Sequence, residues 1–189
     1  MARRTQQLNI SLSDVSFQLE SFEILTFITV PTLQNYQFVA ALNTMLEIDL
    51  RNNGVIEIFR KKQAFQNVIY SVLTERELLY ILLDIRNSNL DKALKSYDKI
   101  LFISGDYNKN DPSDFLVNNF QLHLPDTIEC RRWDFPDIEN PADKGTESLL
   151  KLLNGDRNNE GLLCQIEMHL KTQMDLEENN QEYKDEFLF

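Results

Sequence analysis

Four side chains in the second half of the chain are of the types that bind zinc, namely His123, Cys130, Cys164 and His169. Together they offer the two thiolates and two imidazoles of a tetrahedral site. Cys164 and His169, however, are five residues apart on an expected helix, where residues three or four apart share a face. His123 and Cys130 lack the short spacing of a zinc knuckle. The sequence therefore predicts no metal site, but two core thiols and two surface imidazoles.

Other catalytic patterns are incomplete. Ser104 follows an apolar stretch, but the glycine that precedes the serine of a nucleophile elbow is missing. The five glycines occur singly, so no phosphate-binding loop is expected. The acidic loop 106–112 lacks the glycine and the final glutamate of a calcium loop. We predict no catalytic residue, no cofactor and no metal. An enzyme whose site is assembled from scattered polar residues remains an alternative.

Charge is distributed unevenly along the chain. Residues 1–99 hold eleven Lys/Arg and eleven Asp/Glu, whereas residues 100–189 hold eight and nineteen, so the second half carries the whole net charge of −11. The basic runs Arg60–Lys62 and Arg131–Arg132 are short, whereas a protein that binds nucleic-acid phosphates needs a basic stripe. We therefore predict no direct nucleic-acid binding. An acidic decoy that mimics nucleic acid is a second alternative.

Interaction with a protein is the function that the sequence favours. An expected helix over 159–175 carries one apolar stripe, which is typical of a core face or of a docking face. Beyond it, residues 174–189 hold six carboxylates and one lysine but end in Phe-Leu-Phe. We predict a non-enzymatic adaptor that contacts a protein partner, or a second copy, through this helix and tail. The expected contact residues are Leu163, Ile166, Leu170, Met174, Phe187, Leu188 and Phe189.

Hydrophobic patterning predicts the elements that would position these residues. The motif Arg51-Asn-Asn-Gly54 is typical of a tight turn between strands. The mixed order of the elements predicts an α+β fold with a mostly antiparallel sheet covered by helices on one face, and a helical acidic C-terminal appendage. Strands are expected over 23–30, 55–59, 65–73, 78–85, 99–103 and 127–133, and helices over 33–47, 90–97, 111–120, 146–153 and 159–175.

Composition suits one domain with additions. We predict an α+β core over 1–133, a proline-containing linker over 134–145, a helical appendage over 146–175 and an acidic tail over 176–189. Two cysteines cannot form a disulfide framework, and acidic or polar residues interrupt every long apolar stretch. We therefore expect a cytoplasmic protein without a membrane span.

Short sequence patterns along the first two thirds of the chain recur at distances typical of a known family. They are the basic start, the strand at 24–30, Leu33-Gln34-Asn35-Tyr36, Leu42-Asn43, Ile48-Asp49-Leu50, Asn87-Ser88, and Tyr97-Asp98 leading into Lys99–Ile103. Over about residues 1–135 the chain thus resembles a bacterial family of uncharacterised small proteins named IPExxxDY. Lys99 stands where that family has tyrosine, and no Ile-Pro-Glu precedes Asp98. The family has no established activity, and the resemblance implies a cytoplasmic protein.

Overall fold

The computed structural model describes residues 17–18, 21–60, 62–74, 78–86, 88, 90–105, 111–124, 126–133, 144–156 and 159–173. The main strands are β1 (Phe22–Thr29), β2 (Arg51–Arg60), β3 (Gln63–Leu73), β4 (Leu79–Asp84), β5 (Lys99–Ser104) and β6 (Thr127–Trp133). A small hairpin consists of β7 (Gly155–Asp156) and β8 (Asn159–Glu160). The helices are α1 (Asn35–Leu46), the 3-10 helix η3 (Lys92–Leu94), α2 (Pro112–His123), α3 (Lys144–Asn154) and a C-terminal helix over 162–173.

The six main strands form one antiparallel sheet in the order β2-β3-β4-β5-β1-β6. Leu79–Leu83 of β4 and Ile100–Ile103 of β5 are unbroken apolar runs, and both runs are fully buried. An antiparallel strand with one wet face would alternate apolar and polar residues, so these runs indicate cover on both faces. The predicted α+β class and the interior placement of Leu79–Leu83 are confirmed, while Leu78 precedes the strand and is half-buried.

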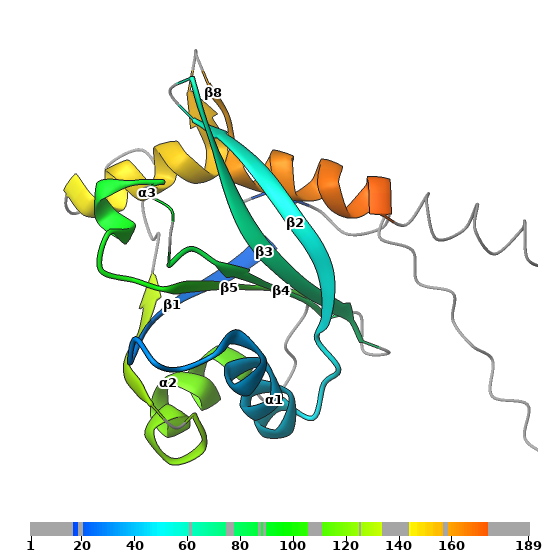
Figure 1. The fold of residues 1–189 in the computed structure, drawn as a ribbon, viewed down its shortest axis with the longest axis vertical. Coiled ribbons are helices and arrows are strands. Elements are labelled where there is room, and N and C mark those ends of the chain that lie inside the picture. The colour runs from blue at the N-terminus through cyan, green and yellow to red at the C-terminus, as the bar shows by residue number, and fades with distance from the viewer. Residues whose placement is uncertain are drawn as a thin grey trace, which may run out of the picture.

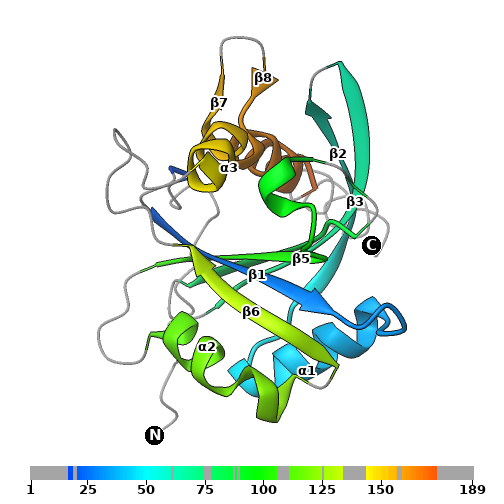
Figure 2. The same ribbon diagram turned by 90° about the vertical axis from the view of Figure 1, so that its left-hand side faces the viewer.

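Helices cover both faces of the sheet (Figures 1 and 2). α1 and α2 lie on one face, while η3, α3 and the C-terminal helix lie on the other. Leu101 of β5 shares a buried cluster with Phe38 of α1, whereas the next residue, Phe102, shares the opposite cluster with Leu149 of α3. The expectation that helices cover one face alone is therefore wrong. Successive side chains of a strand point to opposite faces, so a strand apolar throughout needs cover on both.

The C-terminal helix packs directly on the sheet. Its apolar stripe is buried in the cluster that also holds Ile56 and Ile58 of β2. Leu163, Ile166 and Leu170 belong to this stripe, so their burial corrects the prediction that they contact a partner and assigns them to the chain's own core. Met174, Phe187, Leu188 and Phe189 lie outside the described residues, as do the tail at 176–189 and the linker positions 134–143. Within the described part, no helix is long and apolar enough to cross a membrane.

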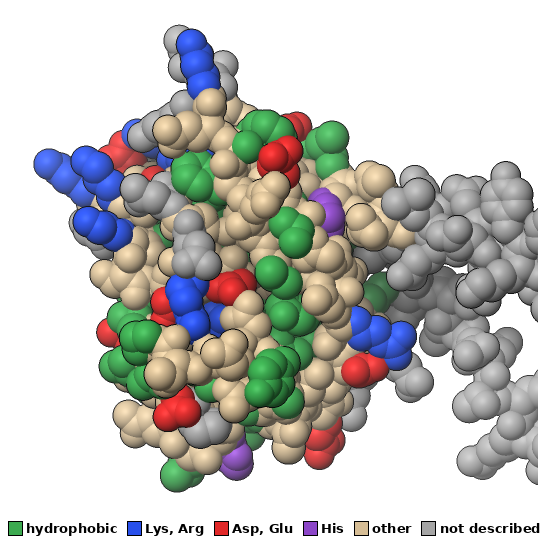
Figure 3. Space-filling model, viewed as in Figure 1, with side chains coloured by type: hydrophobic (Ala, Val, Ile, Leu, Met, Phe, Trp, Pro, Cys, Tyr) green, Lys and Arg blue, Asp and Glu red, His purple; other side chains and the backbone are tan. Residues whose placement is uncertain are grey.

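The C-terminal helix also covers the edge of β2. The side-chain amide of Gln165 accepts a hydrogen bond from the Phe59 backbone N–H (2.8 Å) and donates one to the Phe59 carbonyl (3.3 Å). His169 Nε2 lies 3.0 Å from the Asn53 carbonyl. An edge strand with free backbone groups invites pairing with another chain. On the outer face of the same strand, Val55 and Phe59 are 55% and 58% exposed, and Figure 3 shows hydrophobic side chains at the surface on this side.

The first half of β2 differs from the predicted turn. Residues 51–54 continue the strand, and the pairing with β3 shifts register between Asn52 and Val55. Gly54 has φ +85°, a left-handed conformation that an extra residue in a strand requires and that glycine adopts without strain. Asn-Gly thus produces a bulge, and the hairpin closes later, beside Lys62 with φ 65°. The helix expected over 90–97 shortens to η3.

Asp111 begins α2 as the sequence predicts. Its carboxylate accepts hydrogen bonds from the backbone N–H groups of Ser113 and Asp114, and Pro112 occupies the first turn. Arg132 of β6 forms ion pairs with Asp111, Asp114 and Glu23 of β1. Burial raises the pKa of Glu23 above its usual value. Through Arg132, these carboxylates connect β1, α2 and β6, so their role is to stabilise the fold.

Candidate functional site

The four zinc-type residues are separated by the sheet. His123 ends α2 and Cys130 lies on β6, where it packs against the cluster under α1 and α2. Cys164 and His169 lie on the C-terminal helix, which covers the opposite face. Among the described residues, no three His, Cys, Asp or Glu side chains are grouped so that they could hold a metal ion. His123 and Cys130 therefore lie on the other side of the sheet from Cys164 and His169, so the four cannot bind one ion.

Both thiols favour the protonated form. Burial raises the pKa of Cys130 to about 12. The Cys164 thiol donates a hydrogen bond to the Glu160 carboxylate (3.2 Å), which raises its pKa as well. The thiolate is the nucleophile and the metal ligand of cysteine. Neither cysteine is therefore prepared for nucleophilic chemistry or for metal binding.

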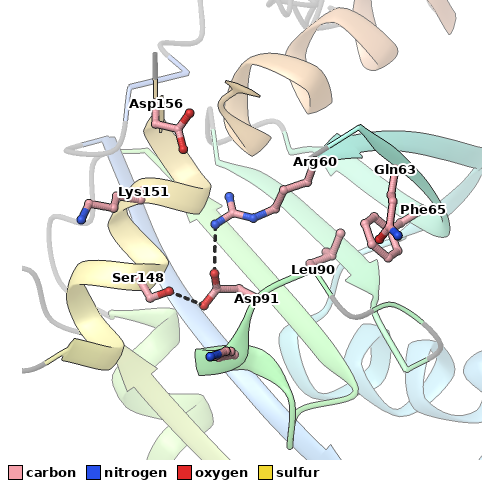
Figure 4. Close-up of a pocket in the computed structure, with 9 residues that line it drawn as sticks. Arg60, Gln63, Phe65, Leu90, Asp91, Ser148, Lys151 and Asp156 are labelled. Carbon is pink, nitrogen blue, oxygen red and sulfur yellow. Dashed lines mark hydrogen bonds and ion pairs between the residues drawn. The ribbon is translucent and has the colours of Figure 1, made fainter. Parts of the chain in front are cut away.

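A cavity of about 490 Å³ opens where the β2–β3 hairpin, η3 and α3 converge (Figure 4). Its volume is in the range of small-molecule sites, roughly 300–1,000 Å³. The elements that meet here are distant in sequence, and none of the zinc-type residues takes part. The lining residues are Arg60, Gln63, Phe65, Leu90, Asp91, Lys92, Ser148, Lys151 and Asp156.

Arg60 and Asp91 form a buried ion pair at the wall of this cavity. Arg60 Nη2 donates to Asp91 Oδ2 at 3.0 Å, and each residue is 8% exposed. Asp91 Oδ1 accepts two further hydrogen bonds, from Ser148 Oγ (2.7 Å) and from the backbone N–H of Ala93 (2.9 Å). Asp91 thereby caps η3 and ties both β2 and α3 to it. A buried pair is stable only when its remaining donors and acceptors are also satisfied.

The Arg60 side of the pair is not satisfied. Its Nε–H is buried and has no hydrogen-bond partner among the described residues. An unmet buried donor costs about 1–3 kcal/mol. Lys92 and Lys151 are also among the lining residues, and an ammonium group has three N–H donors. Lys151 reaches Glu147 one turn earlier on the exposed side of α3. The cavity thus lies beside a buried guanidinium donor that has no acceptor among the described residues.

The cavity has a polar side and an apolar side. Figure 4 places Ser148, Lys151 and Asp156 on the α3 side, and Phe65 with Leu90 and the polar Gln63 toward the β2–β3 hairpin. Arg60 lies between them and points its guanidinium toward Asp91. A site with an apolar wall and a few convergent polar groups orients a ligand that has both kinds of surface.

The lining residues suit binding better than catalysis. They include no histidine and no cysteine. The Ser148 hydroxyl donates a hydrogen bond to the Asp91 carboxylate, which Arg60 and the Ala93 N–H already hold, and the described lining residues offer no histidine that could activate a serine nucleophile. The residues of this wall can donate hydrogen bonds to an anion and attract it by their positive charge.

Sequence reasoning missed this site, although one signal for it exists. Ile56 and Ile58 point into the core, and Arg60 continues their alternation, so the strand period places its side chain on the buried face. The run Arg60–Lys62 was thus more than strand-end charge. The positions of Asp91 and Ser148, 31 and 57 residues away from their respective partners, follow from tertiary packing.

A second buried cation, Lys99, lies on the α1 side of the sheet. Its ammonium donates to Asn35 Oδ1 at 2.6 Å and lies 3.7 Å from Asp84 Oδ1. It also lies 5.4 Å from the centre of the Phe38 ring. Asn35 in turn donates to the other Asp84 oxygen. Burial lowers the pKa of Lys99 below its usual value, against the opposing effect of Asp84.

Arg86 completes the group around Lys99. Its guanidinium donates to the Pro31 and Leu33 carbonyls and to Thr29 Oγ1 at 3.3, 2.9 and 2.8 Å. Its Nε makes no hydrogen bond but lies 3.8 Å from Asp98 Oδ1. Arg86 therefore has an acceptor on most of its guanidinium, whereas Asp91 is the acceptor found for Arg60 among the described residues.

Comparisons with family models, curated proteins and solved structures found no match to this chain. The resemblance to the IPExxxDY family stays a prediction.

Proposed function

We propose that this chain is a non-enzymatic binding protein that takes up a small anion in the cavity between the β2–β3 hairpin, η3 and α3. One observation carries the proposal: Arg60 lines a ligand-sized cavity, and the Nε–H of its buried guanidinium has no partner in the described part of the chain. A carboxylate or phosphate oxygen is the acceptor that arginine binds best.

The charges of the lining support an anion of low charge. Among the described lining residues, Arg60, Lys92 and Lys151 supply three positive charges and Asp91 and Asp156 supply two negative ones, which leaves one positive charge for a ligand to balance. The chain as a whole carries −11. Its overall field repels highly charged anions. A basic wall inside so acidic a protein therefore favours a local, specific ligand over a polyanion.

Titration with sodium acetate, followed by ¹H–¹⁵N spectra at constant ionic strength, tests this function. Acetate is the smallest carboxylate probe, and sodium chloride keeps the ionic strength fixed. We expect saturable shifts that concentrate on the cavity lining, such as the amides of Asp91 and Ser148. Non-saturable shifts spread over the surface would contradict the proposal.

A matched pair of lysines controls this titration. Lys151 and Lys171 are both exposed and both pair with a glutamate four residues earlier, but Lys151 lines the cavity and Lys171 does not. Lys151→Gln should weaken acetate binding about fivefold, since a charge pair at 4 Å in water contributes about 1 kcal/mol. Lys171→Gln should leave the dissociation constant unchanged. Equal effects of the two changes would indicate nonspecific screening.

The adaptor function remains a second proposal, and the segment from Met174 onward is what can carry it. Six carboxylates followed by Phe-Leu-Phe is a composition suited to a partner with an apolar groove and a basic rim. Truncation after Asp185 tests it. Loss of a copurifying partner at unchanged melting temperature supports a recognition segment, and a truncated chain that keeps both its partner and its melting temperature rules this role out.

A further inference from the structure

We infer that the ligand of this cavity is an organic monoanion with an apolar body of about the size of a ring. The inference rests on the anion-binding function proposed above and adds the class of the ligand. Its anionic group would lie by Arg60 and Lys151, and its body against Phe65 and Leu90.

The division of the cavity wall carries the first step. Arg60 and the polar residues of α3 face one part of the cavity, while Phe65 and Leu90, with the polar Gln63 beside them, form the part toward the hairpin (Figure 4). Phe65 is half-buried and packs on the core beneath the helices. An inorganic anion would satisfy the guanidinium but leave the apolar wall uncovered. An apolar body attached to the anion removes that wall from water.

The charge of the cavity wall favours a monoanion over a dianion. The wall has one net positive charge, and Asp91 is already buried and held by three donors. A dianion would bring its second negative charge within a few ångströms of that carboxylate in a poorly solvated place. A single carboxylate balances the wall. It can also accept from Arg60 and from a lysine at once, because it has two oxygens.

Three sodium salts distinguish the ligand classes: acetate, benzoate and hydrogen phosphate, at pH 7.5 and constant ionic strength. Dissociation constants come from the same ¹H–¹⁵N titrations. We expect benzoate to bind at least about tenfold more tightly than acetate, since its ring adds apolar area that becomes buried. Phosphate, largely a dianion at this pH, should bind no more tightly than acetate.

Two phenylalanines of the hairpin provide the matched variants. Phe65 lines the cavity, whereas Phe59 lies on the outer face of β2 and is exposed. Phe65→Ala should weaken benzoate binding until its dissociation constant lies within about threefold of the acetate constant of the same variant. Phe59→Ala should preserve the tenfold difference. Phe65→Leu, which keeps most of the apolar volume, replaces Phe65→Ala if that variant does not fold.

The outcomes separate the two proposals. If acetate and benzoate bind equally well in the wild-type cavity, the ligand class is wrong and anion binding stands. If phosphate binds most tightly, the assignment of the ligand as a monoanion is wrong. If none of the three salts produces saturable shifts at the cavity, the proposed function itself fails.

Discussion

Two buried cations among the described residues, Lys99 and Arg60, have different surroundings. Lys99 on the α1 side has Asn35, Asp84 and the Phe38 ring around it. Arg60 on the α3 side has Asp91 as its acceptor, an Nε–H without a partner and a cavity beside it. Burying a charge is costly unless it is paired and hydrogen-bonded. A cation enclosed by groups of its own chain holds elements together, whereas one that lines a cavity can also receive a ligand.

The largest expected effect tests whether the Arg60 pair stabilises the fold. Asp91→Ala leaves the guanidinium buried and unpaired and removes the cap of η3. We expect a loss of about 3–5 kcal/mol in the free energy of unfolding, measured by urea denaturation. Asp49→Ala is the control, because Asp49 also pairs with an arginine, Arg51 at 2.8 Å, but both side chains are exposed. That change should cost less than about 1 kcal/mol, and similar losses for both variants would contradict the buried role.

A smaller effect tests the link between Asp91 and α3. Ser148→Ala removes one of the three donors to the Asp91 carboxylate and leaves the ion pair intact. We expect a loss of about 0.5–1.5 kcal/mol in unfolding free energy, the usual contribution of one hydrogen bond. Ser96→Ala, at an exposed position outside the cavity, should change stability by less than about 0.5 kcal/mol. A neutral Ser148→Ala would mean that α3 is held by apolar packing alone.

The dependence of stability on alkaline pH tests the surroundings of Lys99. Burial lowers the pKa of Lys99 in the folded state, so between that lowered value and the usual 10.5 the unfolded chain binds more protons than the folded one. The free energy of unfolding therefore gains a contribution that rises with pH through this window. Lys99→Met should remove that contribution. The difference in melting temperature between wild type and Lys99→Met should grow in favour of wild type as the pH rises from 8 to 10.5.

Cys130 and Tyr70 act in the opposite direction over the same range. Their folded-state pKa values are raised, mainly by burial, so their contributions to stability fall as the pH rises. Both residues are present in wild type and in Lys99→Met, so the difference between the two proteins isolates Lys99. A difference that stays constant or shrinks with pH would contradict the lowered pKa.

How far the sequence predicts this molecule depends on the range of the interaction. Local patterns sufficed for β4, whose apolar run Leu79–Leu83 has no polar alternation, and for the start of α2 at Asp111. Asn53-Gly54 shows the limit, since a dipeptide that favours positive φ serves a bulge as well as a turn. The apolar stripe of the C-terminal helix is likewise typical both of a helix in the core and of a helix that docks on a partner. In the fold the stripe packs against the inward side of β2, so it belongs to the core.

The candidate site depends on interactions of the longest range. Its ion pair joins the end of β2 to the cap of η3, and Ser148 adds α3 from the last quarter of the chain. No residue spacing within a single segment predicts that these three elements lie together. The strand period could place Arg60 on the buried face, but only the packed fold shows that its Nε–H is left without an acceptor.

The most direct test of the account is the Nε–H resonance of Arg60 during titration with sodium benzoate. Arg60→Lys, which keeps a cation opposite Asp91, identifies this resonance by its absence. The account predicts that the Nε–H signal moves downfield and exchanges more slowly with water as benzoate saturates, because its donor gains a carboxylate acceptor. An Nε–H signal that stays in place while the cavity amides reach saturation would contradict the central role of Arg60.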